Sequence, residues 1–240
     1  MALPTLVLLA TIIATGAAFQ RLTGMGFALL ASPFLVLALG PFEGILVTNL
    51  CGLVSSLLNL SLVHRDVEWR RLARFTPFSI VGIGAGTVLL RILPADPLAI
   101  LVGVSILLAI ALTVFFRSDG IPDSLPLSAG CGAASGIMNV TAGVGGPALA
   151  VYAAATRWPH RGFAASAQVH FAAVCLLSLA AKATLPSFAA TGWVVTVAAI
   201  LAGTVVGQRL AGRFSDPALR RLVILLSTAG AVVTIVEALV

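Results

Sequence analysis

Charged residues are scarce in this sequence. They make up 9% of its 240 residues, whereas 60% are hydrophobic, and the mean hydropathy is +1.12. Soluble domains carry roughly 25% charged residues, so the composition excludes a soluble globular fold and indicates a polytopic membrane protein with the lipid bilayer as a partner. The net charge of +6 does not point to nucleic acid, because the basic residues lie in short loops between apolar runs, where they set membrane orientation.

Groups that catalyse reactions or bind metals are also few. The three cysteines, Cys51, Cys131 and Cys175, lie in apolar segments without CxxC or Cys/His spacing, so we expect neither a disulfide nor a metal site. The sequence contains no His-Glu-x-x-His or Gly-x-Ser-x-Gly motif and no carboxylate pair within an apolar run. We therefore expect no enzyme activity and no cofactor.

Ten apolar segments predict an all-α integral membrane protein. A helix crosses a bilayer with ~20 residues, in a range of about 17–25, so segments 27–39 and 146–156 are too short to cross upright. The chain lacks the positively charged start of a signal peptide, so the first apolar run is expected to remain as a membrane helix. The ten segments are roughly 3–19, 27–39, 44–63, 75–93, 98–116, 126–140, 146–156, 163–181, 192–208 and 218–239.

Each short segment follows a glycine-rich stretch, Gly24-Met25-Gly26 in the first half and Gly143-Val144-Gly145-Gly146-Pro147 in the second. Glycine leaves a helix easily, and irregular backbone within a membrane is tolerated only where it is buried in protein or lines a watery cavity. The two stretches therefore predict two broken helices or helical hairpins. Short, glycine-interrupted segments at matching places in two halves are typical of a transporter's binding site.

The two halves match along their length. The glycines of the two breaks align at an offset of 119 residues, and three further motifs align at offsets of 118 to 121. A nearly constant offset indicates an internal repeat. We predict membrane repeats 1–116 and 126–240, joined by a cytoplasmic linker, 117–125. The further motifs are Pro41 and Gly44 with Pro159 and Gly162, Gly82-x-x-x-Gly86 with Gly203-x-x-x-Gly207, and Asp96-Pro97 with Asp216-Pro217.

Charge predicts the topology. If each repeat crosses the membrane an odd number of times, one face receives 11 basic residues and the other only Arg91 and Lys182, with Arg21 set aside because it lies in the first break. If each broken pair makes a single crossing, the same residues divide 6 against 7. The positive-inside rule favours the first arrangement, which inverts the second repeat and places both termini outside the cytoplasm. Inverted repeats are typical of secondary transporters.

The glycine stretches also occur in an order that resembles a known family. They comprise Gly24–Phe27 with Ser32-Pro33 in the first repeat and Gly136 through Pro147 in the second, together with the basic loop His64–Arg74. In this order, and with the two-half layout, they resemble the TauE/SafE family of sulfite and organosulfonate exporters over nearly the whole chain. The resemblance implies a carrier of the bacterial inner membrane that moves small sulfur-containing anions, usually outward.

The predicted binding site lies at the two breaks. An anion within a membrane needs hydrogen-bond donors and positive potential, which helix N-termini supply. The helices that begin after Gly26 and Gly146 are expected to offer N–H groups to an oxyanion; alternatively, these glycines only permit tight helix packing. The candidate substrate-binding residues are Gln20, Arg21, Thr23, Gly24, Met25 and Gly26 in the first break and Asn139, Thr141, Gly143, Val144, Gly145 and Gly146 in the second.

Three polar residues outside the breaks complete the prediction. Asn49 and Gln168 occupy nearly equivalent positions of the two repeats and are expected to line the cavity. His170 is either a possible proton relay or a satisfied core histidine.

Alternatives remain for the residues of the breaks. The guanidinium of Arg21 matches a sulfite or sulfonate, and a charge in a membrane segment is a functional hypothesis by default, but Arg21 could instead extend to the cytoplasmic interface. Asn139 and Thr141 could merely cap the broken helix.

These observations predict a transporter that exports small sulfur-containing anions by alternating access. The alternatives are a transporter of another small organic anion, a passive anion channel and, with less support, a membrane-embedded enzyme or a membrane assembly factor. A homodimer is possible, because the Gly-x-x-x-Gly motifs permit close helix approach, although packing within one chain explains them equally.

Overall fold

The computed structural model describes residues 3–24, 26–115, 120–213 and 216–240, and these residues form ten α-helices and one 3-10 helix without a β-strand. The prediction of an all-α membrane fold is confirmed. In chain order the elements are α1 (Leu3–Thr23), α2 (Phe27–Leu39), α3 (Pro41–Val63), η1 (His64–Asp66), α4 (Trp69–Ile92), α5 (Ala95–Phe115), α6 (Leu125–Ala142), α7 (Gly146–Ala155), α8 (His160–Lys182), α9 (Ala190–Leu210) and α10 (Asp216–Leu239). Met25 and the linker residues 117–119 lie outside the described residues.

Seven of the described helices are long and apolar enough to cross a membrane, namely α1, α3, α4, α5, α8, α9 and α10. The two segments that looked too short for an upright crossing form α2, with 13 residues, and α7, with 10 residues. Many large apolar side chains of the long helices are exposed, as a lipid-facing surface requires. The chain is a multi-pass membrane protein.

Each broken segment folds into a hairpin. The glycines that open the two breaks have positive φ angles, +81° at Gly24 and +73° at Gly143, which side chains rarely adopt. Beyond the first break α2 turns back onto α1, where a Cβ at Gly16 would lie 2.9 Å from the ring of Phe27. Beyond the second, a Cβ at Gly145 would lie 2.9 Å from the carbonyl oxygen of Ser135 on α6.

The helices extend further into the breaks than the sequence indicated. The N–H of Gly24 donates to the carbonyl of Gln20 at 2.8 Å, and the N–H of Gly143 donates to the carbonyl of Asn139 at 2.9 Å. Helical hydrogen bonding therefore continues to the first glycine of each break, because glycine ends a helix where its φ becomes positive. Five residues that the sequence placed in the breaks are instead helical: Gln20, Arg21, Thr23, Asn139 and Thr141.

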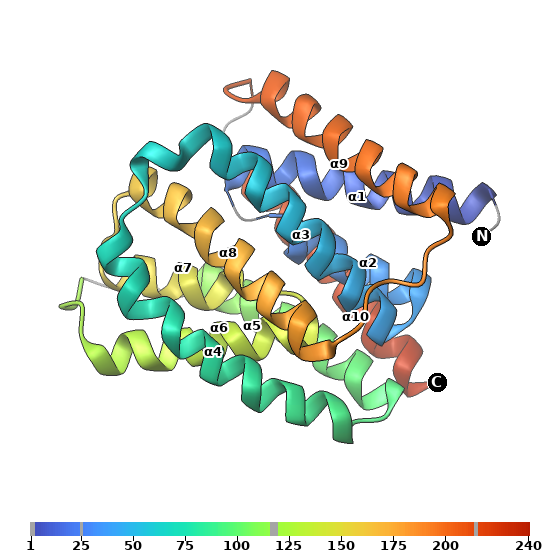
Figure 1. Cartoon of the computed structure of the whole chain (residues 1–240), viewed down its shortest axis with the longest axis horizontal. Helices are drawn as coiled ribbons and strands as arrows, with labels where there is room; N and C mark the ends of the chain where they lie inside the picture. Colours follow the sequence, from blue (N-terminus) through green and yellow to red (C-terminus); the bar gives the residue numbers. More distant parts are fainter. Residues whose placement is uncertain (1–2, 25, 116–119, 214–215) are drawn as a thin grey trace.

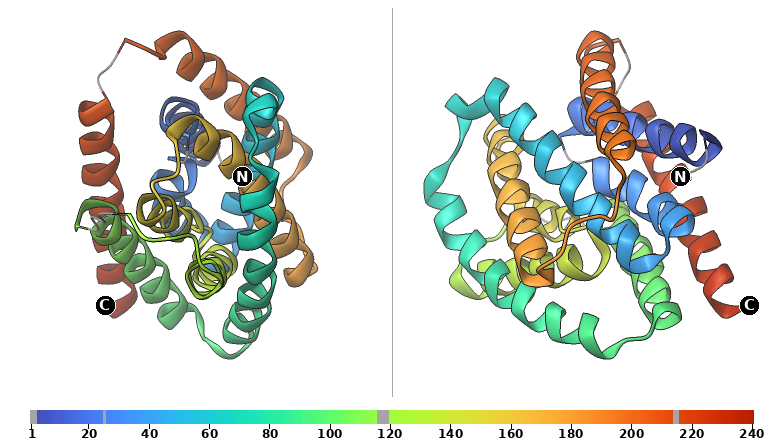
Figure 2. Two further views of the ribbon diagram at one scale, coloured as in Figure 1. Left: turned by 90° about the vertical axis from the view of Figure 1, so that its left-hand side faces the viewer. Right: turned by 45° about the vertical axis from the view of Figure 1, so that its right-hand side comes forward.

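Glycines let helices from the two halves of the chain approach closely. α4 packs along α6, and α1 packs along α9 (Figure 1). A Cβ at Gly82 would collide with the carbonyl oxygen of Ala133, and a Cβ at Gly203 would collide with that of Ala14. In addition, α3 packs against α8. α5 packs against α10, and Figure 2 shows this green and red pair side by side. Each of these pairs joins one helix of the first half to one of the second.

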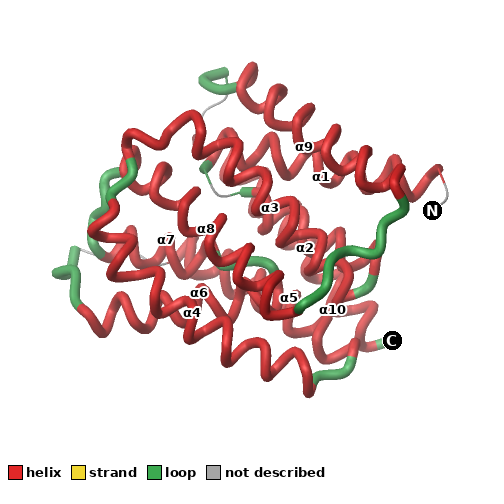
Figure 3. The backbone as a smooth tube through the Cα atoms, viewed as in Figure 1, coloured by secondary structure: helices red, strands yellow, loops and turns green. Residues whose placement is uncertain are grey.

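The loops gather at two ends of the helix bundle (Figure 3). One end carries both chain termini and the connections α2–α3, α4–α5 and α8–α9, whereas the other carries α3–α4, α7–α8 and α9–α10 (Figure 1). The membrane orientation of these ends stays a prediction.

Candidate functional site

The two breaks meet at one cavity, called the central cavity below. It has a volume of about 30 Å³, which is room for roughly two water molecules. Its described lining contains no charged side chain. The polar side chains that line it are those of Gln20, Thr48, Ser56, Asn139 and Cys175.

Two helix N-termini border the central cavity. Gly145 and Gly146 line it at the start of α7, and Phe27, Ala28 and Leu29 line it at the start of α2. Neither of these helix starts has a side-chain cap. The first N–H groups of an α-helix lack intrahelical partners and lie at the positive end of the helix dipole. Helix N-termini of this kind bind oxyanions in other proteins.

Asn139, in the last turn of α6, connects the second break to helices α3 and α8. Its Nδ2 donates to Oδ1 of Asn49 at 3.2 Å and to Oγ of Ser178 at 2.9 Å. The thiol of Cys175 lies 3.9 Å from its Oδ1. All four side chains are buried, so Asn139 closes the space between α6, α3 and α8 with satisfied hydrogen bonds.

Gln20, in the last turn of α1, makes the corresponding contacts at the first break. Its Nε2 donates to Oγ of Ser56 at 3.0 Å and to Oε1 of Gln168 at 3.1 Å. Gln168 in turn donates to the carbonyl of Gly24 at 2.8 Å. These contacts tie the first break to α3 and α8.

The two sets of contacts are equivalent in the sequence. The residues around Gln20 and those around Asn139 correspond in pairs that lie 119 positions apart, and each break and adjoining helix end follows the same offset. The corresponding pairs are Gln20 and Asn139, Asn49 and Gln168, Ser56 and Cys175, and Asn59 and Ser178.

A second cavity of about 190 Å³, called the vestibule below, lies beside the end of α1. Gln20 lines both the vestibule and the central cavity, so this amide lies between them. Arg21 lines the vestibule, and its Nε donates to Oε1 of Gln208 at 2.5 Å. The full lining is Gln20, Arg21, Leu22, Thr23, Gly24, Asn59, Val63, His160, Ala164 and Gln168.

Residues 8–234 match the sequence profile of the family described as Sulfite exporter TauE/SafE. The chain belongs to this family. The match covers nearly the whole sequence and confirms the resemblance inferred from the glycine stretches. The chain is accordingly a membrane protein of a transporter family. No curated protein and no solved structure matches it.

The structure divides the predicted site residues of this TauE/SafE member among three locations. The central cavity is lined by Gln20, Asn139, Gly143, Val144, Gly145 and Gly146. The vestibule is lined by Gln20, Arg21, Thr23, Gly24 and Gln168. Neither described lining includes Gly26, Asn49 or Thr141. Met25 lies outside the described residues.

Thr141 and Asn49 lie outside the described lining of both cavities. Thr141 bonds within its own helix, whereas Asn49 contacts a residue that lines the central cavity. The hydroxyl of Thr141 donates to the carbonyl of Ile137 in its own helix at 2.7 Å. Asn49 is fully buried and accepts the hydrogen bond from Asn139. Asn49 therefore positions the amide that lines the central cavity.

His170 also acts through another residue. Its Nε2 lies 2.9 Å from Oγ of Ser135, and its Nδ1 lies 3.2 Å from Oγ1 of Thr76. The Ser135 hydroxyl donates to the carbonyl of Gly145 at 2.8 Å, so it can only accept from His170. The ring is thus the Nε2–H tautomer and holds the second break in place through Ser135. Neither cavity, as the described residues define it, is lined by His170, and its use as a proton relay stays a prediction.

Sequence reasoning missed several residues that line the central cavity. Ser56 and Cys175 are repeat counterparts in contact with Gln20 and Asn139, so the offset of 119 is the signal that finds them. Thr48 touches the second break, because a Cβ at Gly143 would lie 2.7 Å from its methyl group. Phe171 also lines the cavity, and no local pattern distinguishes it from the other phenylalanines.

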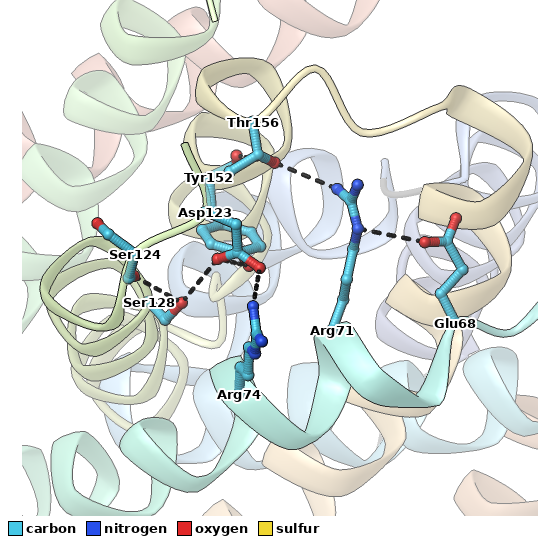
Figure 4. Close-up of polar contacts among 8 residues, drawn as sticks. All are labelled: Glu68, Arg71, Arg74, Asp123, Ser124, Ser128, Tyr152 and Thr156. Atoms are coloured by element: carbon cyan, nitrogen blue, oxygen red, sulfur yellow. Dashed lines mark hydrogen bonds and ion pairs between the residues drawn. The ribbon is translucent and has the colours of Figure 1, made fainter. Parts of the chain in front are cut away.

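A polar network fastens the linker to the neighbouring helices (Figure 4). Asp123 accepts hydrogen bonds from the Tyr152 hydroxyl at 2.6 Å, from Nη1 of Arg74 at 3.1 Å and from the Ser128 hydroxyl at 3.3 Å. Burial alone would raise the pKa of the Asp123 carboxyl group, but these hydrogen bonds outweigh it, and the pKa is lowered. The carboxylate therefore links the linker to α4, α6 and α7.

Proposed function

We propose that this protein exports small sulfur oxyanions, such as sulfite or an organosulfonate, by alternating access. The observation that carries the proposal is the convergence of two uncapped helix starts, α2 and α7, on one cavity bordered by the amides of Gln20 and Asn139. Backbone and side-chain N–H groups can surround the oxygens of a tetrahedral or pyramidal anion. Family membership supports the same substrate class.

The helix pairing supports two inverted repeats. If α1–α5 correspond to α6–α10, then α4 on α6 and α9 on α1 are the same contact made twice, and α3 on α8 and α5 on α10 are each a helix on its own counterpart. The glycine contacts agree, because the pair Gly82 and Ala133 corresponds to the pair Gly203 and Ala14. A pseudo-two-fold axis through the central cavity explains both observations, as in other transporters with inverted repeats.

The amide pairs suit the two closures that alternating access requires. In this conformation Gln20, hydrogen-bonded to Gln168, lies between the vestibule and the central cavity, so a small shift of the Gln20 side chain would join the two spaces. The corresponding Asn139 and Asn49 contact lies on the other side of the central cavity and is fully buried. Rocking one repeat against the other would open one pair while it closes the other.

The distribution of basic residues supports an outward direction. The end of the bundle that carries Arg65, Arg70, Arg71 and Arg74 also carries Arg157 and Arg161. The positive-inside rule assigns this end, where the vestibule lies, to the cytoplasm. An anion collected there would be driven outward by a membrane potential that is negative inside.

Counterflow in proteoliposomes tests the proposal. Unlabelled sulfite inside the vesicles should accelerate uptake of labelled sulfite if the protein is a carrier, whereas a passive channel shows no such acceleration. Gly146→Leu should reduce counterflow to background, since a Cβ there already lies 3.3 Å from Phe171 and the cavity has no room for a larger side chain. Gly130→Leu is the matched control, because Gly130 is exposed and a Cβ there meets nothing. Equal counterflow in both variants would contradict the site.

A further inference from the structure

Lys182 is the only lysine in the chain and the last residue of α8. Its ammonium nitrogen is buried and has no hydrogen-bond partner among the described residues. A buried cation without a partner is costly, and a lysine at a helix end normally extends its flexible side chain to water. The side chain of Lys182 does not do so, which calls for an explanation.

Carboxylates do not supply the missing partner. The three ion pairs of the described residues involve other basic groups. Glu43, at the same end of the bundle, instead accepts hydrogen bonds from the backbone N–H of Ser187 at 2.6 Å and from its hydroxyl at 3.1 Å. The thiol of Cys175, which lines the central cavity, is close to Lys182, but as a neutral group it supplies no compensating charge.

The direction of the side chain follows from helix geometry. A helical side chain leans toward the N-terminus of its helix, so that of Lys182 lies over the turn that carries Ser178. Ser178 accepts a hydrogen bond from Asn139, and Cys175 lies one turn further along the same face. Lys182 therefore extends inward, toward the closure formed by Asn139, and not outward to the membrane surface.

The repeat relates Lys182 to a residue of the vestibule. The counterpart of Lys182 is Val63, the last residue of α3, which lines the vestibule together with Arg21. The counterpart of Arg21 is Val140, which packs against Leu177 and Ala181 beside Lys182. Each end of the pathway thus has one cation and one valine at the same two positions, with the two residues exchanged.

We propose that Lys182 is the anion-binding group of a second vestibule, closed in this conformation, at the end of the pathway opposite Arg21. The inference rests on the proposed function, because it requires that the two repeats alternate. When the Asn139 and Asn49 contact opens, Lys182 faces the new space and binds the oxyanion before its release. In the closed conformation it is buried without a partner, and the cost of that burial favours opening of this end.

Three variants test the proposal, with Arg91→Gln as the matched control because Arg91 is an exposed basic residue at the same end of the bundle. Thermal unfolding in detergent is measured with sodium sulfite and, at equal ionic strength, with sodium chloride. Lys182→Met should leave the melting temperature in chloride unchanged or raise it, since it removes an unpaired buried charge. It should also weaken stabilisation by sulfite and raise the half-saturating sulfite concentration for counterflow by about 10-fold or more, as loss of a hydrogen bond to a charged group does.

The conservative variant separates binding from packing. Lys182→Arg keeps the charge and should stay within about 3-fold of the wild-type concentration, because both groups bind oxyanions, and Arg91→Gln should not differ from wild type. Wild-type sulfite dependence in Lys182→Met, or a lowered melting temperature in chloride, would overturn the inference and leave the proposed function intact. Wild-type protein that neither is stabilised by sulfite nor shows counterflow would overturn the proposed function itself, and the inference with it.

Discussion

The two ends of the proposed pathway carry corresponding residues in different arrangements. At the vestibule end, Gln20 lies between two cavities, and its Oε1 has no hydrogen-bond partner among the described residues. At the opposite end, Asn139 binds Asn49 and Ser178, and all three side chains are buried. Asparagine is one methylene shorter than glutamine, so the same side-chain contact spans a shorter distance there. One repeat sequence thus makes a tight closure and the other a loose one.

The charges differ in the same way. Arg21 lies in the larger cavity with its guanidinium bound to Gln208, whereas the ammonium of Lys182 is buried without a partner. A cation that is accessible at one end and enclosed at the other is what one conformation of an alternating carrier would contain. Variants at corresponding residues of the two ends test whether the ends differ in this way.

Substitution of Asn139, at the tight closure, should lower stability and counterflow more than substitution of Gln20, at the loose one. Asn139→Leu leaves Oδ1 of Asn49 and the Ser178 hydroxyl without their donor in a buried site, which costs about 1–3 kcal/mol for each group. We expect counterflow to fall by ~100-fold or more, because this closure must form and open in each cycle. Gln20→Leu should cost less stability, since water in the adjoining cavities can replace its hydrogen bonds.

Counterflow rates and denaturant unfolding of the two variants, measured side by side, check this difference. Losses of equal size in Asn139→Leu and Gln20→Leu would show that the two ends are equally closed and would remove the basis of the comparison.

The two breaks provide a second comparison, with a smaller expected effect. Both Gly24 and Gly143 have positive φ, so alanine strains either position by roughly 1–2 kcal/mol. At Gly143 the added methyl would also lie 2.7 Å from Thr48, whereas at Gly24 the nearest atom is the Cβ of Ala164 at 3.6 Å. Gly143→Ala should therefore lower the free energy of unfolding more than Gly24→Ala, by about 1–3 kcal/mol for the steric contact.

Urea or guanidinium titration of both variants gives this difference, with Gly84→Ala as the control because a Cβ at Gly84 meets nothing. If Gly24→Ala were the more damaging, the first break and not the second would be the tightly packed one.

The sequence predicted the elements of this site better than their contacts. Apolar run length and the paired glycines were sufficient for the helices and for both breaks, since these depend on local chain properties. The offset of 119 also identified Asn49 and Gln168 as corresponding residues. Asn49 contacts Asn139, and Gln168 contacts Gln20, so each binds an amide of the other repeat. These contacts arise because helices of one half pack against helices of the other, which no local pattern encodes.

The sequence did not predict that the side chain of Lys182 is buried. From the sequence Lys182 was one of two basic residues on the less basic face, at the end of a helix face that also carries Gln168, Cys175 and Ser178. The burial of its ammonium nitrogen is a property of the tertiary structure. The same holds for Arg21, where the sequence left a binding role and an interfacial role open and the structure places the residue in the vestibule. Burial of charge is decided by packing, which composition does not report.

Arg21 should affect capture of the anion and not its final binding. It lines the vestibule and not the central cavity, so its charge attracts anions toward the pathway. Arg21→Gln should raise the half-saturating sulfite concentration from the vestibule side by roughly 3–10-fold at low ionic strength, and the difference from wild type should shrink as salt is added. Initial rates of sulfite transport at two ionic strengths test this. Complete loss of binding at every salt concentration would place Arg21 in the binding site itself.

Asp123 should have the smallest effect, because its network fastens the linker and does not line either cavity (Figure 4). Its pKa is lowered in the folded protein, so its contribution to stability is complete above the ordinary carboxyl pKa of ~3.9 and is lost as the pH falls through the lower folded-state value. Asp123→Asn should reduce the free energy of unfolding at neutral pH by about 1 kcal/mol, since Arg74 is largely exposed and solvent screens the ion pair. It should also flatten the acid limb of the stability profile, measured by thermal unfolding between pH 3 and pH 7. Asp96→Asn, at an exposed position, controls for the loss of one negative charge; an equal loss of stability in the two variants would show that net charge, and not the contacts of Asp123, holds the linker against α4 and α7.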